Sequence, residues 1–231
     1  TIGRRQRQMC IRDRYIILHM ETLSTSKWNE YREYTLDRFD STGVDYDPYW
    51  HVWIEDVLHP ELFEFVNMEW PDFESGEWKW AYSKNAIDQN QNRKIYQPNR
   101  ANGIQFWKEY YDNMIDNEYI ISAAYRLEGM HTEPDSVTAS LWEDYKGYCV
   151  GNHVDHYTID LAWQTYVYCD AGEDWGTRMN DSNGNQLKRF PFKSNCAWLM
   201  RVDANSWHSC DPVESNVRRS IMARFMTDQR G

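Results

Sequence analysis

The chain has 231 residues, enough for one domain with a sizeable core, and a formal net charge of −11. This acidic balance argues against a nucleic-acid partner, because proteins that bind polyanions normally carry a basic footprint. No apolar run approaches the length of a transmembrane helix, and no apolar segment of the signal-peptide kind follows the N-terminus. We therefore expect a cytoplasmic protein with no membrane partner.

The first 14 residues differ in character from the rest. They hold five arginines and one aspartate, so the remaining residues carry 20 basic against 35 acidic side chains. The segment resembles translated sequencing read-through, and a basic, disordered arm is the other interpretation. We expect residues 15–46 to form an N-terminal extension and residues 47–231 to form the single folded domain.

The first elements of this domain are a strand and a helix. A weak helical pattern over residues 27–38 precedes them. A turn at residues 45–47 leads into a strand over residues 50–57. Pro60 suits the first position of a helix, which Pro71 ends. The apolar stripe of this helix is formed by Leu62, Phe65, Val66 and Trp70.

Two more amphipathic helices follow a polar segment. Residues 74–103 are rich in loop-forming residues, with a short strand predicted over residues 78–82. A helix is predicted over residues 104–115. Asn117 is suited to cap the next helix at its start, and Gly129 is suited to end it.

After His131 the pattern changes to short strands separated by Gly, Asn, Asp and Pro. The predicted strands cover residues 136–145, 149–155, 159–168, 177–180, 185–190, 197–202, 207–211 and 218–227. Helices followed by many short strands predict an α+β, mainly β fold, an antiparallel sandwich with packed helices.

The cysteines and the aromatic residues favour structural roles. The five cysteines show no short paired spacing of the zinc-binding kind, so we expect small buried side chains. The 12 Trp and 16 Tyr suit an aromatic core and cleft, although stacking on a ring-shaped substrate is an alternative.

The chemistry-bearing pattern lies in the second half. His153 and Asp155 are separated by one residue, so in a regular strand both would project from one face, with His156 on the other. With the distant His208 they form the two-histidine, one-carboxylate set typical of non-haem Fe(II) enzymes. Near-matches at His19, His59 and His131 carry Glu instead of Asp and lack this context. A lone histidine is more often structural, so the order and spacing of the whole set carry the prediction.

These residues, followed by Arg218 and Ser220, resemble the 2-oxoglutarate- and Fe(II)-dependent oxygenases. The likeness is greatest to the prolyl 4-hydroxylase-like branch and its virus-encoded or metagenomic relatives. It covers about residues 47–227. It implies a double-stranded β-helix (jelly roll) with N-terminal helices packed on one sheet. It also implies metal ligation by the three residues, and Fe(II), 2-oxoglutarate and O2 as cofactor and cosubstrates, with ascorbate as an optional addition.

The resemblance also assigns roles around the metal ligands. Arg218 is expected to bind the far carboxylate of 2-oxoglutarate, with Ser220 adding a hydroxyl from the same strand face. Arg219 points the other way unless a bulge near residues 216–217 swaps the two. Tyr148 is a weaker candidate for the cosubstrate, and a packing role for it is nearly as good. Because Asp155 is a carboxylate, hydroxylation of a C–H bond with release of succinate and CO2 is expected.

The substrate itself is not encoded in a readable motif. Its contacts are expected in residues 74–103 and 130–137. A small molecule or a protein side chain fits the resemblance, and the sequence indicates no oligomeric state. Alternatives are a non-catalytic jelly-roll binding protein with a vestigial metal site, and an iron enzyme that does not use 2-oxoglutarate. A nucleobase demethylase is disfavoured by the charge.

Overall fold

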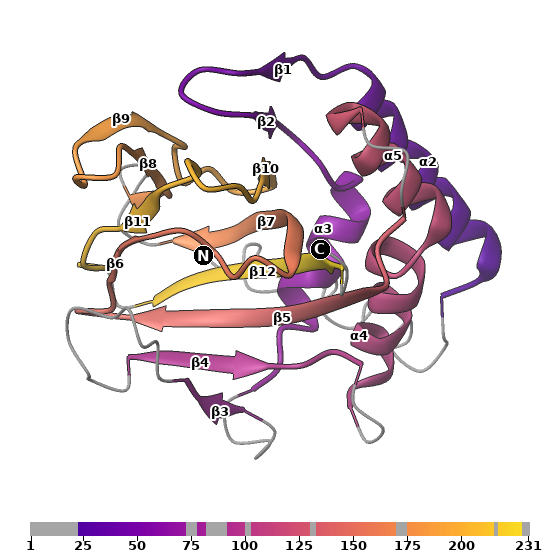
Figure 1. Cartoon of the computed structure of the whole chain (residues 1–231). Coiled ribbons are helices and arrows are strands. Elements are labelled where there is room, and N and C mark those ends of the chain that lie inside the picture. The colour runs from indigo at the N-terminus through magenta and orange to yellow at the C-terminus, as the bar shows by residue number, and fades with distance from the viewer. Residues whose placement is uncertain are drawn as a thin grey trace, which may run out of the picture.

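The structure is a computed structural model that describes residues 23–72, 78–81, 92–99, 103–129, 133–169, 175–214 and 217–227. The expectations for residues 1–14, His19, His131 and the possible bulge at Asn216 lie outside this part of the chain. Within it, the fold is mainly antiparallel β-sheet with helices, as predicted (Figure 1). No described helix is long and apolar enough to cross a membrane.

The described helices include one with favourable capping residues at both ends. They are α2 (Thr25–Asp40), α3 (Pro60–Met68), α4 (Gln105–Tyr110), which continues as a π-helix over Tyr111–Ile115, and α5 (Glu118–Glu128). The Asn117 side chain accepts a hydrogen bond from the Tyr119 backbone N–H at the start of α5. Gly129 ends that helix with φ of 78°, a left-handed conformation that glycine adopts without strain.

The strands form one large and one small antiparallel sheet. In the eight-stranded sheet the order is β1 (Val44–Asp45), β2 (His51–Ile54), β10 (Cys196–Arg201), β7 (Ile159–Cys169), β12 (Val217–Met226), β5 (Ser136–Tyr145), β4 (Arg93–Tyr96) and β3 (Lys79–Trp80). In the four-stranded sheet it is β6 (Val150–His153), β11 (His208–Cys210), β8 (Arg178–Asn180) and β9 (Gln186–Arg189).

Strand β1 was not predicted, because residues 45–47 were expected to form a turn, and two strands beside the pocket also differ from the prediction. Strand β4 was missed, because Arg93 and Lys94 lie in a polar run that indicated a loop. Its pairing with β5 and the burial of both side chains give it a place in the sheet. Strand β6 ends at His153, so Asp155 lies beyond the strand and not within it as expected.

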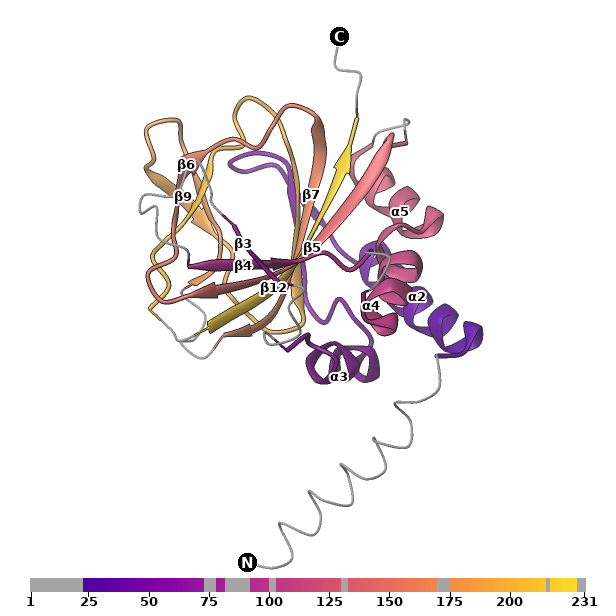
Figure 2. The same ribbon diagram turned by 90° about the horizontal axis from the view of Figure 1, so that it is seen from below.

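The large sheet has a different neighbour on each face. The helices pack on one face and form the larger apolar cluster with every second residue of the strands. This cluster includes Trp28, Tyr31 and Phe39 of α2, so that helix shares the main core. The small sheet lies over the other face, where Met179 and Phe190 pack against Tyr166, Trp198, Met200 and Met222. Figures 1 and 2 show the helices gathered on one side of the molecule, away from β6, β8, β9 and β11.

Candidate active site

Strands β6 and β11 bring together the two histidines that the sequence places 55 residues apart. His153 and His208 are direct partners in the antiparallel register, and their ring centroids lie 4.2 Å apart. Asp155 follows two residues after β6. Its carboxylate lies 3.7 Å from Nε2 of His153 and 3.8 Å from Nε2 of His208. One ligating atom from each of the three residues lies within 4.8 Å of the others, close enough to hold one metal ion.

Both imidazoles are oriented by the same backbone contact. Nδ1 of His153 lies 2.9 Å from the carbonyl oxygen of Gly151, and Nδ1 of His208 lies 2.9 Å from that of Ser206. A carbonyl only accepts, so each Nδ1 carries the proton in the neutral ring and each Nε2 keeps a free lone pair. A backbone carbonyl is a common partner for the far nitrogen of a metal-bound histidine. The donor set therefore fits a divalent transition metal.

Burial and neighbouring charges set the protonation of these groups. Burial on its own would raise the pKa of the Asp155 carboxyl, but the contact with His153 and the charge of His208 outweigh it. The pKa of Asp155 is therefore lowered, to about 2. Burial lowers the pKa of His208. At neutral pH this leaves a charged Asp155 carboxylate beside a neutral His208 imidazole, the states that metal ligation requires. At His153 burial opposes the charged form, but the contact with Asp155 outweighs it and raises the pKa.

His156 does not join the three residues, but the strand alternation behind that expectation does not apply, because β6 ends at His153. It lines the neighbouring pocket, but its Nδ1 lies 2.9 Å from the Thr158 hydroxyl. Among the described residues, the group that could hold a metal consists of His153, Asp155 and His208.

A pocket of about 300 Å³ opens beside the three residues, between the two sheets. Aromatic and apolar side chains form part of its wall, among them Trp142, Trp198, Val154 and Met222. Its charged lining, within the described part of the chain, consists of Asp155 and three arginines, Arg93, Arg218 and Arg224. In a protein with a net charge of −11, this concentration of guanidinium groups marks the pocket as suited to anions.

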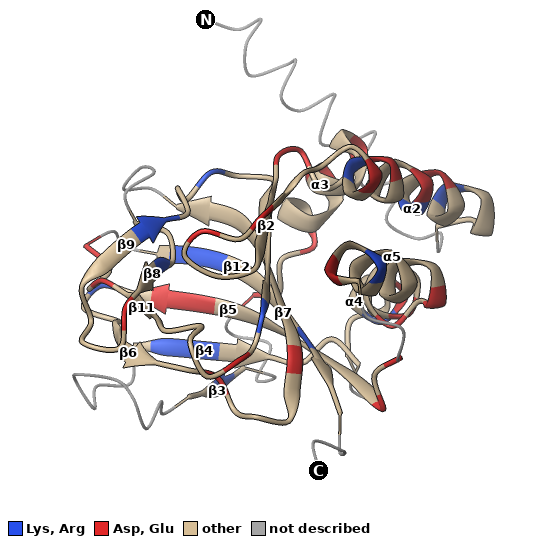
Figure 3. Cartoon of the chain, turned by 45° about the horizontal axis from the view of Figure 1, so that its top comes forward, with Lys and Arg blue, Asp and Glu red and all other residues tan. Residues whose placement is uncertain are grey.

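Two of these arginines share one buried carboxylate. Arg93 donates to Asp144 from Nε and from Nη2, the latter at 2.9 Å. Arg218 donates to Oδ2 of the same residue from Nη2 at 2.6 Å and from Nε at 3.1 Å. Asp144 is fully buried, and the two arginines hold its pKa below the usual range although burial opposes this. Figure 3 shows the basic segments of β4 and β12 on either side of the acidic segment of β5.

The side chains of β12 alternate between the two faces of the sheet as predicted. Arg218 faces the pocket, whereas Arg219 faces the other way and donates to Glu143 at 2.9 Å. The irregularities of β12 occur against β7, at Arg219/Ser220 and at Phe225/Met226. Ser220 is fully buried, and its hydroxyl accepts a hydrogen bond from Nε2 of Gln164 at 3.0 Å. Its hydroxyl thus supports Gln164, which lines the pocket.

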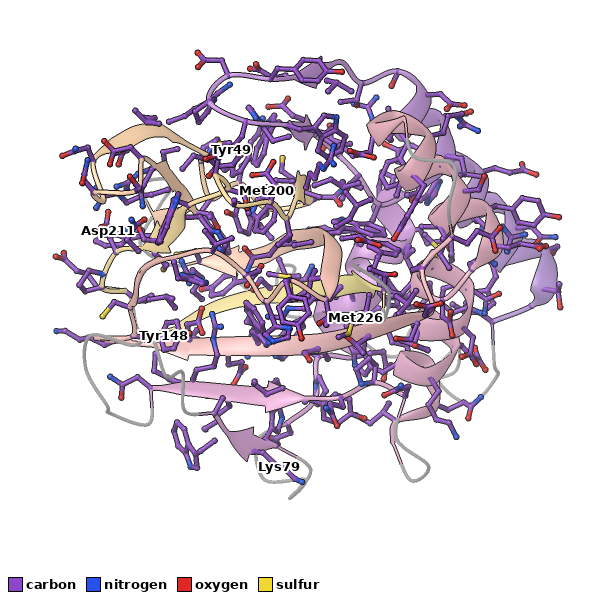
Figure 4. All side chains as sticks on the ribbon, viewed as in Figure 1. Tyr49, Lys79, Tyr148, Met200, Asp211 and Met226 are labelled. Carbon is purple, nitrogen blue, oxygen red and sulfur yellow. The ribbon has the colours of Figure 1, made fainter. Side chains whose placement is uncertain are left out.

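Tyr148 lies at the pocket wall between β5 and β6 (Figure 4). Its hydroxyl is buried and meets no hydrogen-bond partner among the described residues. The Arg93 guanidinium lies 4.1 Å from the centre of its ring. Burial raises the pKa of this phenol, so the hydroxyl stays protonated and able to donate. A buried donor without a partner beside two arginines fits the carboxylate of a bound ligand.

Sequence reasoning missed two pocket arginines. Arg224 follows Arg218 by six residues, and the parity that selected Arg218 over Arg219 also places Arg224 on the pocket face. Arg93 offered no comparable signal, because its strand was not predicted. The segment 130–132 and most of residues 74–103, where substrate contacts were expected, lie outside the described residues, although Ala81, Arg93 and Ile95 do line the pocket.

Solved structures share this fold. A prolyl-4-hydroxylase from Pseudomonas putida superposes with a TM-score of 0.60 at 12% sequence identity, covering 84% of this chain and 98% of its own. A Trichoplax adhaerens prolyl hydroxylase, in complex with a hypoxia inducible factor oxygen degradation domain peptide fragment, gives a TM-score of 0.57 at 13% identity. That match covers 90% of this chain and 95% of its own.

A third structure is an oxidoreductase of the 2OG-Fe(II) oxygenase family from Burkholderia pseudomallei. Its TM-score is 0.59 at 13% identity, over 78% of this chain and 89% of its own. No protein-family model and no curated protein matches the chain. At these identities the likeness shows the fold, and the chemistry has to be argued from the residues of this chain.

Proposed function

We propose that the protein is an Fe(II)- and 2-oxoglutarate-dependent dioxygenase of the hydroxylase type, built on a double-stranded β-helix. The observation that carries the proposal is the geometry of His153, Asp155 and His208, with both Nδ1 atoms tied to backbone carbonyls. Three protein ligands of this kind leave positions open on a metal, which suits oxygenase chemistry more than a closed structural site.

The pocket residues fit the cosubstrate as well as the metal. When bound, Fe(II) with 2-oxoglutarate and O2 supplies the oxidising power to hydroxylate a C–H bond, with release of succinate and CO2. Arg218, with Arg93 and the free hydroxyl of Tyr148, is suited to bind the far carboxylate of 2-oxoglutarate. Trp142, Trp198 and Met222 add apolar surface to the pocket wall, which would limit water around the bound cosubstrate.

The hydroxylated group is a C–H bond of a small molecule or of a protein side chain. The second option is supported by the Trichoplax adhaerens protein, which shares the fold and was solved with a peptide. The acidic charge of the chain favours neither, but it disfavours a nucleic-acid substrate.

An anaerobic titration tests the proposal directly. Fe(II) added to the protein with 2-oxoglutarate is expected to give a charge-transfer band at roughly 500–530 nm, which requires both groups at one site. Admission of O2 is then expected to release succinate. His208→Ala should abolish the band, whereas Phe225→Ala, on the helix-facing side of the sheet, should keep it.

Three outcomes would separate the alternatives. A metal affinity without the band would indicate an iron enzyme that does not use 2-oxoglutarate. A band without succinate release would indicate a binding protein with a vestigial site. Absence of metal binding at His153, Asp155 and His208 would overturn the proposal as a whole.

A further inference from the structure

We propose that the primary substrate carries a carboxylate and that Arg224 binds it. The inference rests on the proposed function, since it assigns a substrate class to the same pocket. It starts from the three pocket arginines, which differ in how they are paired. Arg93 and Arg218 both have Asp144 as a counter-charge. Arg224 has no hydrogen-bond or ion-pair partner among the residues that the structure describes.

Arg224 is held in position by an aromatic ring. Its guanidinium lies 5.2 Å from the centre of the Trp142 ring, and the Arg93 guanidinium lies 3.7 Å from the same ring. A cation near an aromatic face is moderately stabilised, but this contact satisfies none of the five N–H donors of an arginine. Burial lowers the pKa of Arg224, which indicates that its charge is poorly solvated. A partly buried, unpaired guanidinium lining a pocket is a site for an oxyanion.

Charge balance distinguishes this site from that of the cosubstrate. Around the pocket, three guanidiniums face the carboxylates of Asp144 and Asp155, which leaves one positive charge when the imidazoles are neutral. A divalent metal and dianionic 2-oxoglutarate cancel each other and leave that charge in place. One remaining charge is matched by a monoanion, so a carboxylate fits better than a phosphate dianion.

The position of Arg224 assigns this charge to the substrate side. Asp144 and Arg218 pair with each other at one end of the register between β5 and β12. Arg224 pairs with Thr138, six residues further along, and Asp155 is the carboxylate that acts most on its charge. The Cα atoms of Arg218 and Arg224 are therefore roughly 20 Å apart along the strand, at about 3.3 Å per residue. Asp144 is paired with Arg93 and Arg218, whereas Arg224 lines the pocket together with Asp155 and the two histidines.

Matched acid and amide probes test the inference on the protein loaded with Fe(II) and 2-oxoglutarate without O2. The pairs are propionate with propionamide and benzoate with benzamide, and binding is measured by calorimetry. We expect each acid to bind at least about tenfold more tightly than its amide, because a charge-assisted contact to arginine is lost in the amide. In Arg224→Gln the ratio should fall to about one. Arg224→Lys should keep part of the preference for the acid over the amide. Arg219→Gln, on the other face of the strand, should keep all of this preference.

The charge-transfer band separates this inference from the proposed function. The band is recorded before any probe is added, so its absence counts against the proposed function alone. The acid–amide comparison on the metal-free protein then still tests Arg224. Equal binding of acid and amide by the wild-type protein, or an unchanged ratio in Arg224→Gln, would overturn the inference. Loss of the band on adding an acid would also overturn it, because Arg224 would then belong to the cosubstrate site.

The carboxylate has two sources, a free small molecule or an acidic side chain of a polypeptide. Succinate release is compared for free L-amino acids and for blocked peptides that carry one Asp or Glu, each beside its amide. If succinate release is stimulated by the acid and not by the amide, the inference is supported, whether the carboxylate belongs to a free amino acid or to a peptide. Stimulation by amides as strong as by acids contradicts it.

Discussion

The two faces of the large sheet are built from the same strands but differ in chemistry. On β12, Ile221, Ala223 and Phe225 face the helices and are almost completely buried among apolar side chains. The alternate residues of the strand, Arg218, Ser220, Met222 and Arg224, face the small sheet. Strand β5 shows the same alternation, with Leu141 toward the helices and Trp142 and Asp144 toward the pocket.

This difference separates stability from function. The helix-facing side buries apolar area, which is the main favourable contribution to folding. The pocket-facing side buries guanidinium and carboxylate groups, whose desolvation costs more than their pairing returns in many proteins. Apolar side chains on the second face would avoid this desolvation cost, so the buried charges there are best explained by ligand binding.

The largest effect is expected from removing the charge that the two arginines share. Asp144→Asn should lower the free energy of unfolding by about 3–5 kcal/mol, because two buried guanidiniums lose their counter-charge. Since Arg93 and Arg218 hold the pKa of Asp144 below its unfolded value of about 3.9, its contribution is complete above that pH. It is lost as the pH falls through the lower, folded-state pKa. Urea unfolding of the wild type and of Asp144→Asn, at pH 7 and below pH 4, measures the difference in stability and its dependence on pH. A difference that is independent of pH would contradict this account.

A variant on the opposite face should cost almost as much stability without touching the pocket. Phe225 is fully buried and in edge-to-face contact with Tyr125 at 6.0 Å. Phe225→Ala should lower the free energy of unfolding by about 3 kcal/mol through lost burial and a residual cavity. At a temperature where the variant is folded, its affinity for Fe(II) and 2-oxoglutarate should equal that of the wild type. A parallel loss of affinity would show that the two faces are coupled.

The same alternation explains how much of the fold the sequence could predict. Strand β5 was predicted with its observed bounds, and α5 with both caps, because a period of two and cap residues are local signals. Strand β4 was missed since its pocket-facing Arg93 breaks the apolar pattern. Its burial depends on Asp144, which is 51 residues away in sequence. A charge paired at long range carries no local signal.

The candidate site was predictable to a similar degree. The spacing of His153, Asp155 and His208 selected the residues that the structure brings together, although Asp155 reaches them from beyond the end of β6. Their roles as ligands stay a prediction. Parity also separated Arg218 from Arg219. It could not show that Arg218 is bound to Asp144, because strand neighbours are set by the sheet order and not by the chain order.

A smaller effect on stability, but a larger one on binding, is expected at Arg218. Arg218→Ala should weaken 2-oxoglutarate binding by about one to two orders of magnitude, equivalent to roughly 1.5–3 kcal/mol, through loss of a buried charge-assisted contact. Asp144 keeps Arg93 as a partner, so the protein should remain folded. Fe(II) affinity in the absence of 2-oxoglutarate should change little. Titration of 2-oxoglutarate against the charge-transfer band measures the first quantity, and a metal titration alone measures the second.

The smallest effect is expected at the next residue, on the other face. Arg219 is partly exposed and contacts Glu143, which also accepts hydrogen bonds from Nε1 of Trp70 at 2.9 Å and the Tyr145 hydroxyl at 2.6 Å. Because Glu143 keeps these two donors, Arg219→Ala should lower the free energy of unfolding by only about 0.5–1 kcal/mol. Its 2-oxoglutarate affinity should match that of the wild type in the titration used for Arg218→Ala. If Arg219→Ala lost affinity and Arg218→Ala did not, the assignment of the cosubstrate carboxylate to the pocket-facing side of β12 would be wrong, while metal binding by the two histidines and Asp155 would be unaffected.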